Sequence, residues 1–379
     1  MTDKLYYKDA YIKDFTAKIL SVTDTEKGFD IVLDKTAFFP EEGGQSSDTG
    51  YIGDARVCYV YEADGIVHHL ADRDMPLGEI NCQIDFDERF EKMQCHTAEH
   101  ILCGIIHRLF GFDNVGFHLG ENEVAFDVNG VLDRNQLDKV EEIANDVVFS
   151  NIEIKTVFPT AEELSAISYR AKLDITEGVR LVKIGDVDTC ACCAPHVSRT
   201  GEIGLIKILD FMKHRGGTRI WMVAGKRALD DYRSRYDNIK RISAMLCTPQ
   251  LETADTLENY ISDSEAAKSD LKISRLKIAE LEAERINETE GNAVFPFSDF
   301  SIPELIAFSN IANKKVGGIT VTLSGIDGDY KYVISSNTVD LRSISKDINS
   351  ALSGRGGGRP EMIQGSFSVA LDQIKEYFK

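Results

Sequence analysis

The sequence has no apolar run close to the roughly 20 residues that a membrane-spanning helix needs, and its first residues, MTDKLYYKDA, are polar and charged. We therefore expect a cytoplasmic protein with no export signal and no membrane partner. Cysteine is scarce, with eight in 379 residues, which excludes the disulfide framework of a small secreted domain. Basic residues are fewer than acidic ones: the chain has 43 Lys and Arg and 62 Asp and Glu, which gives a net charge of −19. That balance argues against nucleic-acid binding by bulk electrostatics alone.

One stretch departs from this acidic average. Residues 207–241 contain ten Lys and Arg against four Asp. Two interpretations stay open: a local basic surface on an acidic protein, or a solvated helix of mixed charge.

The length of the chain predicts two to four domains, and the pattern along it predicts an α+β multidomain fold. Residues 1–88 consist of short β-type runs separated by Gly, Asp and Pro, which predicts a small N-terminal β-barrel. Residues 89–242 open with an amphipathic helix that stops at Gly111 and continue with alternating strands and helices. Residues 243–291 predict a helical spacer, and residues 292–379 a last unit of strands and helices.

The predicted spacer has a broken heptad pattern. Leu257, Leu271 and Ile278 fall on one heptad position, while Ser264 and Ser274 interrupt the seam. This is typical of a helical spacer or weak coiled coil, and a homodimer through the spacer or the terminal domain is a further hypothesis.

The stretch QCHTAEHILCG places His96 and His100 four residues apart on the predicted helix. Residues at that spacing share a helix face, so the two imidazoles could hold one cation. A zincin protease needs Glu directly after the first His, but Thr97 stands there and Glu99 comes just before the second His. The protease interpretation therefore lacks its general base.

A second pair supplies what the first lacks, because Cys192 and His196 in CCAPHV are also four apart. Together the two pairs offer three histidines and one cysteine, which would fill the tetrahedron that zinc prefers. We therefore predict a Zn²⁺ site, and expect Cys190 and Cys193 to be packing residues. Four protein ligands are typical of a structural site, so whether zinc is catalytic, substrate-anchoring or structural stays open.

HTAEH, CCAPHVSRTGEIGLIKI and the glycine-rich LDKTAFFPEEGGQSSDTG resemble the AlaX-type alanyl-tRNA editing proteins, free-standing relatives of the editing domain of alanyl-tRNA synthetase. GRGGGRPEMIQGS, which we expect to form a loop, is similar to the glycine-rich signature of the DHH-associated domain. The resemblance covers essentially the whole chain and corresponds to the long subclass. It implies a zinc-containing editing core after the barrel and a C-terminal α/β DHH-associated domain after the spacer.

The resemblance also implies an activity. The chain would be an aminoacyl-tRNA deacylase, working without ATP, that hydrolyses mainly the ester of seryl-tRNA(Ala), with glycyl-tRNA(Ala) as a second candidate substrate. An alanine pocket cannot fully exclude these two amino acids, so a second, hydrolytic site restores fidelity. We expect direct attack by water, with no covalent enzyme intermediate.

The resemblance implies a set of substrate contacts: Thr36, Gly43, Gly44, Gln45, Phe117, His118, Thr200, Gly201 and Glu202. Gln45 and His118 are the candidate catalytic residues. Family members often have Thr or Gln where this chain has Phe117 and His118, so the choice between serine and glycine is in doubt. His118 would hydrogen-bond the serine hydroxyl or relay a proton, or would be an ordinary histidine at a strand end.

Three alternatives remain. GGQ also occurs in peptide release factors, but a match of three residues in a β-rich stretch is weak. A zinc-containing tRNA-binding module would have no hydrolytic activity. A hydrolase for a small ester or peptide would give no purpose to Arg355 and Arg359, which could contact phosphate.

Overall fold

The computed structural model describes residues 1–120, 123–171 and 178–379. It contains two compact units, Met1–Lys240 and Arg241–Lys379. Both units combine helices with sheets, so the prediction of a mixed α and β chain with several domains is confirmed. The finer division at residues 88, 242 and 291 stays a prediction. Within the described ranges, no helix is both long and apolar enough to cross a bilayer.

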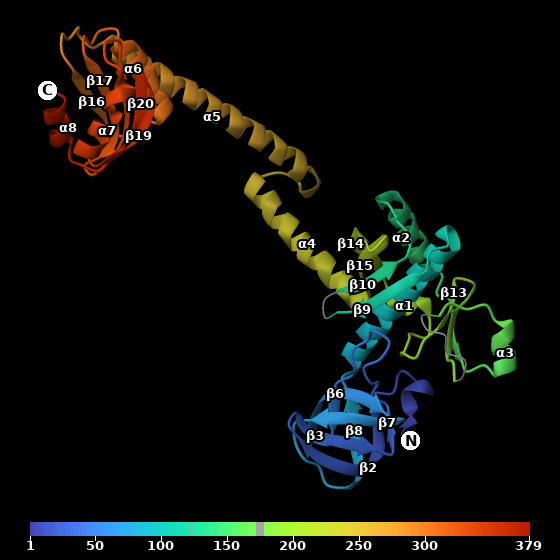
Figure 1. The fold of residues 1–379 in the computed structure, drawn as a ribbon. Coiled ribbons are helices and arrows are strands. Elements are labelled where there is room, and N and C mark those ends of the chain that lie inside the picture. The colour runs from blue at the N-terminus through green and yellow to red at the C-terminus, as the bar shows by residue number, and fades with distance from the viewer. Residues whose placement is uncertain (121–122, 172–177) are drawn as a thin grey trace. The chain divides into compact units, whose positions relative to one another are not determined.

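The first part of unit 1 is a closed antiparallel barrel with the strand order β2-β3-β7-β6-β5-β8, drawn in blue in Figure 1. Its strands are β2 (Asp14–Thr25), β3 (Gly28–Leu33), β5 (Gly50–Ile52), β6 (Ala55–Ala63), β7 (Ile66–Ala71) and β8 (Gly78–Ile84). Burial alternates along β7, where Val67, His69 and Ala71 are buried and the residues between them are partly exposed. Alternation of this kind places one face of each strand inside the barrel. A short pair, β1 (Asp3–Lys4) and β4 (Lys35–Thr36), lies beside it.

Helix α1 (Phe86–Phe110) follows the barrel directly. Its first turn carries Asp87 and Glu88 and its last turn His107 and Arg108, which is the charge order that the helix dipole favours. Gly111 ends the helix with φ at 70°, a left-handed conformation that glycine adopts without strain.

The interior of α1 differs from the sequence prediction. Every residue from Met93 to Ile106 is buried, so the helix is not amphipathic over this length. Helix α2 (Arg134–Phe149), strands β9, β13 and β15, and the short helix η2 (Thr200–Ile203) all contact it. A helix covered on all sides can carry a metal site away from bulk water.

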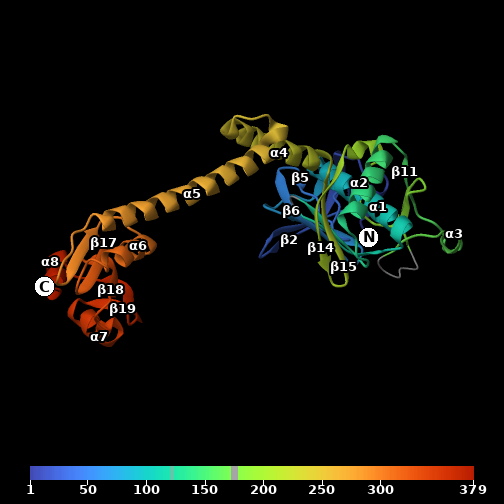
Figure 2. The same cartoon turned by 90° about the horizontal axis from the view of Figure 1, so that it is seen from above.

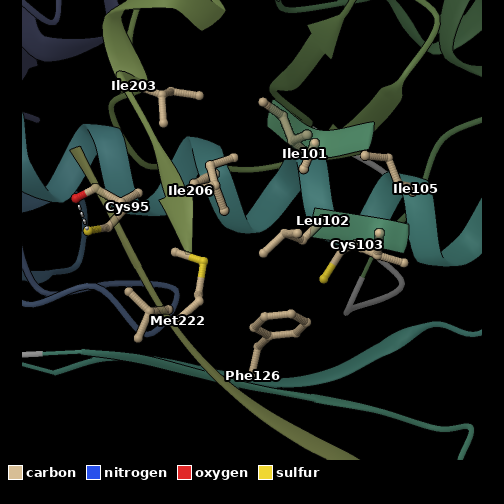
Figure 3. Packing of buried hydrophobic residues seen from close by; sticks show 14 of the residues in the cluster. Cys95, Ile101, Leu102, Cys103, Ile105, Phe126, Ile203, Ile206 and Met222 are labelled. Carbon is tan, nitrogen blue, oxygen red and sulfur yellow. Dashed lines mark hydrogen bonds between the residues drawn. The ribbon is translucent and has the colours of Figure 1, made fainter. Parts of the chain in front are cut away.

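The main core of unit 1 lies between α1, α2 and a sheet of order β14-β15-β10-β9. These strands are β9 (Asn114–Leu119), β10 (Val124–Val128), β14 (Ile206–His214) and β15 (Gly217–Ala224). Figure 3 shows Leu102 of α1 directed towards Met222 and Phe126 of the sheet. This packing fixes the orientation of α1 relative to β9.

A smaller sheet of order β11-β12-β13 completes unit 1. It consists of β11 (Ile154–Val157), β12 (Leu181–Ile184) and β13 (Asp188–Ala191), with helix α3 (Ala161–Ala166) after β11. Because β13 ends at Ala191, it delivers the CCAPH segment to the side of α1.

Unit 2 begins within helix α4 (Gly225–Leu246) and contains η3 (Gln250–Glu252) and the long helix α5 (Thr253–Glu284). Its sheet has the order β16-β17-β18-β20-β19, with β16 (Ala293–Phe297), β17 (Ile319–Ile326), β18 (Asp329–Ser336), β19 (Gly354–Arg359) and β20 (Met362–Phe367). Helices α6 (Ile302–Ala312), α7 (Leu341–Ala351) and α8 (Leu371–Tyr377) belong to the same unit, and Figure 2 shows α6 next to β17. Ala279 and Ala283 near the end of α5 pack with Phe308 of α6.

The segment GRGGGRPEMIQGS is not a loop, as its composition predicted, but the hairpin β19–β20. Gly356 pairs with Gly365. A Cβ on Gly356 would lie 2.5 Å from the Tyr332 hydroxyl, and one on Gly365 would lie 2.8 Å from it. That hydroxyl donates to Asn349 Oδ1 at 3.1 Å, and Asn349 Nδ2 donates to the Gly356 carbonyl at 3.0 Å. The glycines therefore make room for a tyrosine beneath the hairpin.

Candidate metal centre

The two predicted ligand pairs meet. His96 and His100 on α1 and Cys192 and His196 after β13 place their ligand atoms within 4.8 Å of one another. Cys192 Sγ lies 3.7 Å from His96 Nε2 and 3.3 Å from His196 Nε2. Both distances match the edge of a tetrahedron around Zn²⁺, roughly 3.3–3.8 Å for ordinary Zn–N and Zn–S bonds. The three histidines are at most 4% exposed.

Each imidazole is oriented by a partner on Nδ1. His96 Nδ1 donates to Gln45 Oε1 at 2.8 Å, and His100 Nδ1 donates to Asp188 Oδ2 at 3.3 Å. A protonated Nδ1 leaves the lone pair of Nε2 free, which is the arrangement found in zinc sites.

Thr97 orients the third imidazole. Its hydroxyl donates to the Met93 carbonyl at 2.7 Å, so it accepts from His196 Nδ1 at 3.0 Å. All three histidines therefore offer Nε2 to a shared cation. The donor set and its orientation fit zinc.

The protonation states also suit a metal. Burial raises the pKa of the Cys192 thiol, but the imidazoles of His96, His196 and His100 outweigh burial and hold that pKa well below its usual value. Burial lowers the pKa of His196 to about 3. For His100 burial acts downward, yet Cys190, Asp188 and Cys192 together raise its pKa well above the usual value. These shifts favour the thiolate that zinc requires, and a bound cation would take the place of any proton on the imidazole Nε2 atoms.

Asp188 and Arg170 complete the support of His100, and neither has a local signal in the sequence. Asp188 is 6% exposed and accepts from Arg170 Nε at 2.8 Å and Nη2 at 2.9 Å. Cys190, expected as a packing residue, lies beside His100 and Asp188. The carboxylate of Glu99 accepts from the Cys103 thiol at 3.2 Å, on α1 itself.

The glycine-rich loop lies over the ligands. A Cβ on Gly43 would lie 3.5 Å from Cys193 Sγ, and one on Gly44 only 2.6 Å from the Phe117 carbonyl. The Gly44 carbonyl accepts from the Leu119 amide at 3.0 Å, which holds the loop on β9. Phe117 stacks on His96 with the ring centres 4.6 Å apart.

Gln45 has one unused donor. Its side chain is fully buried, and its Oε1 is occupied by His96, but its Nε2 has no partner among the described residues. A buried amide donor without a partner costs roughly 1–3 kcal/mol. The geometry therefore leaves a hydrogen-bond donor next to a metal ligand.

Helix α1 anchors this loop one and two turns before the ligands. Arg89 is 1% exposed, pairs with the buried Asp48 and donates to the Ala37 carbonyl at 2.7 Å. Lys92 Nζ donates to the Ser47 carbonyl at 2.7 Å. The loop and the ligand helix are thus fixed to each other.

Four other predicted contacts have structural partners of their own. The Thr36 hydroxyl bonds His69 Nε2 at 2.9 Å, and the Thr200 hydroxyl donates to the Val147 carbonyl at 2.7 Å. A Cβ on Gly201 would lie 2.6 Å from Asn151 Oδ1, and Glu202 Oε2 accepts from the Tyr11 hydroxyl at 2.7 Å. The structure does not bring these side chains to the ligands, and their substrate roles stay predictions.

His118 lies on β9 next to Phe117 but is exposed. Successive strand residues point to opposite faces, and Phe117 stacks on His96, so His118 points away from the ligands. The catalytic role predicted for it has no support in this geometry.

Comparison with known proteins adds an independent observation. Residues 179–243 match the family described as Threonyl and Alanyl tRNA synthetase second additional domain, a range that includes Cys192 and His196. The alanyl-tRNA editing protein AlaX-L of Pyrococcus horikoshii is 27% identical over the whole of both chains.

Alanine–tRNA ligases also match. The ligase of Methanobrevibacter smithii is 29% identical, and the match covers 96% of this chain and 44% of the ligase. The ligase of Halobacterium salinarum is 32% identical, and the match covers 86% of this chain and 38% of the ligase. This chain thus spans less than half of these ligases. Among solved structures, the C-Ala domain of Aquifex aeolicus alanyl-tRNA synthetase matches with 21% identity, a TM-score of 0.20, and coverage of 23% of this chain and 80% of that one. The chain is therefore a relative of the AlaX-type alanyl-tRNA editing proteins, as its motifs predict, and the match extends over the full length of the long form.

Proposed function

We propose that this protein is an aminoacyl-tRNA deacylase that hydrolyses mischarged tRNA(Ala), mainly seryl-tRNA(Ala) and also glycyl-tRNA(Ala). The observation that carries the proposal is the cluster of three histidines and one cysteine in which each Nδ1 is held by a partner and each Nε2 is left for the shared centre. It occurs in a chain that matches a protein named for alanyl-tRNA editing along its whole length.

His96, His100, Cys192 and His196 would hold Zn²⁺ in this function. When bound, zinc supplies a Lewis acid that anchors the terminal ribose or polarises the reacting carbonyl. Gln45 Nε2 then has a use, since it can donate to the ester or the amino acid beside His96. Phe117 and the glycine loop border the same place.

The reaction needs no covalent enzyme intermediate. Water adds to the ester carbonyl carbon, the acyl C–O bond breaks, and the ribose oxygen takes the proton, which releases a free amino acid and uncharged tRNA. Cys192 is occupied as a ligand, and burial raises the pKa of Cys193, so its thiol stays protonated. A trapped acyl-enzyme on Cys193 would contradict this route.

The test is deacylation of seryl-, glycyl- and alanyl-tRNA(Ala) by wild type and by Gln45→Ala, with zinc content measured for both. Loss of one preorganised donor typically costs 10²–10³ in kcat, so we expect a fall of at least about 100-fold for Gln45→Ala at normal zinc content. Asn135→Ala, which removes a side-chain amide at an exposed position on α2, is the matched control and should keep wild-type activity. An inactive wild type would overturn the proposal, and an active Gln45→Ala would overturn this assignment.

A second candidate is a zinc-containing tRNA-binding module without hydrolytic activity. Four protein ligands are the usual number for a structural zinc site, and this observation favours it. Such a protein would bind tRNA(Ala) and leave all three esters intact at the rate of the buffer control.

Localisation and assembly are separate proposals. We infer a cytoplasmic site of action and a homodimer through the helical spacer or the terminal domain. The exposed Leu257, Leu271 and Ile278 on α5 support the second. Light scattering that gives a monomer at micromolar concentration would contradict it.

A further inference from the structure

A cavity of about 620 Å³ in unit 1 lies outside the metal centre. Its aromatic wall consists of Tyr7 and Phe158, whose ring centres are 5.6 Å apart, and its rim carries Lys4 and Lys8. The volume is within the range of small-ligand sites, roughly 300–1,000 Å³. Phe158 follows β11, outside the barrel, and is 55% exposed although its side chain is large and apolar.

Tyr7 connects this cavity to the metal centre. On one side it contacts Phe158, and on the other it packs in a cluster with Tyr6, Cys192 and Cys193. A ligand in the cavity would therefore lie one side chain away from the segment that carries a metal ligand.

A buried cation lies along the same path. Arg180 is 7% exposed, its Nη1 donates to the carbonyls of Cys192 and Ala194 at 2.8 and 2.9 Å, and its guanidinium carbon is 5.5 Å from the centre of the Tyr7 ring. Its Nε has no partner, and no carboxylate pairs with it, within the ranges that the structure describes. Burial lowers the pKa of Arg180 and the charge of Cys192 opposes that effect, so the guanidinium has its counter-charge at the metal centre.

The lysines at the rim can also turn to a ligand. Lys4 pairs with Glu62 at 2.7 Å and Lys8 with Asp3 at 2.7 Å. Both pairs are partly solvent-exposed, so each contributes little to stability and is readily exchanged. The cavity therefore combines two aromatic rings with two lysines at its rim.

We propose that this cavity binds a nucleotide of the single-stranded 3′ end of tRNA, with the base against Tyr7 and Phe158 and the adjoining phosphate near Lys4 and Lys8. The inference rests on the proposed function, which requires that end to reach the metal centre. Aromatic side chains bind unpaired bases by stacking, worth roughly 5- to 150-fold in affinity per base. A lysine ammonium group binds phosphate as a point charge.

The test measures binding of two tRNA(Ala) transcripts to the full-length protein by fluorescence anisotropy, one intact and one without its three 3′-terminal nucleotides. Phe158→Ala should weaken binding of the intact transcript at least about fivefold and leave the truncated transcript unaffected. Phe158→Tyr should bind like wild type. Phe149→Ala removes a ring that is 73% exposed on α2 and should change neither affinity. Equal effects of Phe158→Ala on both transcripts, or no effect on either, would overturn the proposal.

A parallel deacylation assay with seryl-tRNA(Ala) separates this inference from the proposed function. If wild type hydrolyses the ester but Phe158→Ala and Phe149→Ala bind alike, the cavity assignment fails and the function stands. If binding depends on Phe158 and the 3′ nucleotides but the ester stays intact, the cavity assignment stands and the hydrolase fails.

Discussion

Asp188 supports the metal centre from outside its ligands, because it accepts from His100 and Arg170. We expect Asp188→Asn to weaken zinc binding roughly 10- to 100-fold, because an amide leaves Arg170 without a counter-charge and offers one acceptor instead of two. Competition against a zinc-chelating dye measures this affinity.

Asp186→Asn is the matched control, since Asp186 is exposed in the turn before β13. It should bind zinc like wild type. If Asp188→Asn did so too, the carboxylate would not support His100 in the way described.

Residue by residue, the ligands could be predicted and their supports could not. His96 and His100 share a face of a helix, so spacing alone predicts that they act together, and Cys192 and His196 have the same spacing. Asp188 reaches His100 only because β13 packs against α1, a contact between segments 88 residues apart in the chain. Gln45 was predicted from resemblance, but its bond to His96 depends on the packing of the loop.

Among the elements, the glycine loop permits a controlled test because two glycines have the same φ of +85° in different surroundings. A Cβ on Gly44 would meet the Phe117 carbonyl at 2.6 Å, whereas one on Gly216 would meet nothing within 4 Å. We expect Gly216→Ala to lower the free energy of unfolding by about 1–2 kcal/mol, for the left-handed backbone alone. Gly44→Ala adds a clash and should cost about 2–5 kcal/mol. Equal costs in urea unfolding would contradict close packing of the loop on β9.

The barrel has a pH-sensitive element in His69. Burial lowers the pKa of His69 to about 4, and its two ring nitrogens are satisfied by Thr36 and the Ile31 carbonyl. The unfolded chain, with an ordinary pKa near 6.5, therefore binds the proton more tightly than the folded one between these values. The contribution of His69 to the free energy of unfolding is therefore complete above about pH 6.5. It falls by about 3 kcal/mol as the pH drops towards 4.

The control is His69→Gln, which removes this group. The unfolding free energies of wild type and variant are measured at pH 7 and at pH 4. We expect the advantage of the wild type over the variant to be about 3 kcal/mol smaller at pH 4 than at pH 7. A difference that does not change with pH would show that His69 is not the sensor.

Elements with a strong local pattern were predicted well. The end of α1 at Gly111 follows from a glycine with positive φ. The hairpin β19–β20 was missed because glycine has a low strand propensity, and the reason for its glycines, the Tyr332 hydroxyl beneath them, comes from β18. Burial of α1 on all sides was missed because three of its neighbours, β13, η2 and β15, follow far along the chain.

For the molecule as a whole, the excess of acidic residues limits the basic surface that residues 207–241 suggested. Lys207 pairs with Glu141 at 2.6 Å, Arg219 with Asp127 at 2.7 Å, and Lys226 with Glu91 at 2.6 Å. Arg233 and Arg235 pair within their own helix. The interpretation as a mixed-charge surface is therefore favoured, and recognition of tRNA would depend on shaped sites more than on bulk charge.

The central claim is that the four-residue centre serves ester hydrolysis, and it is tested most directly by seryl-tRNA(Ala) deacylation on protein stripped of metal and then reloaded with Zn²⁺. We predict hydrolysis by the zinc-loaded protein, loss of activity after chelation, and recovery in step with one bound zinc per chain. Deacylation at an unchanged rate without metal, or none with one zinc bound, would contradict it.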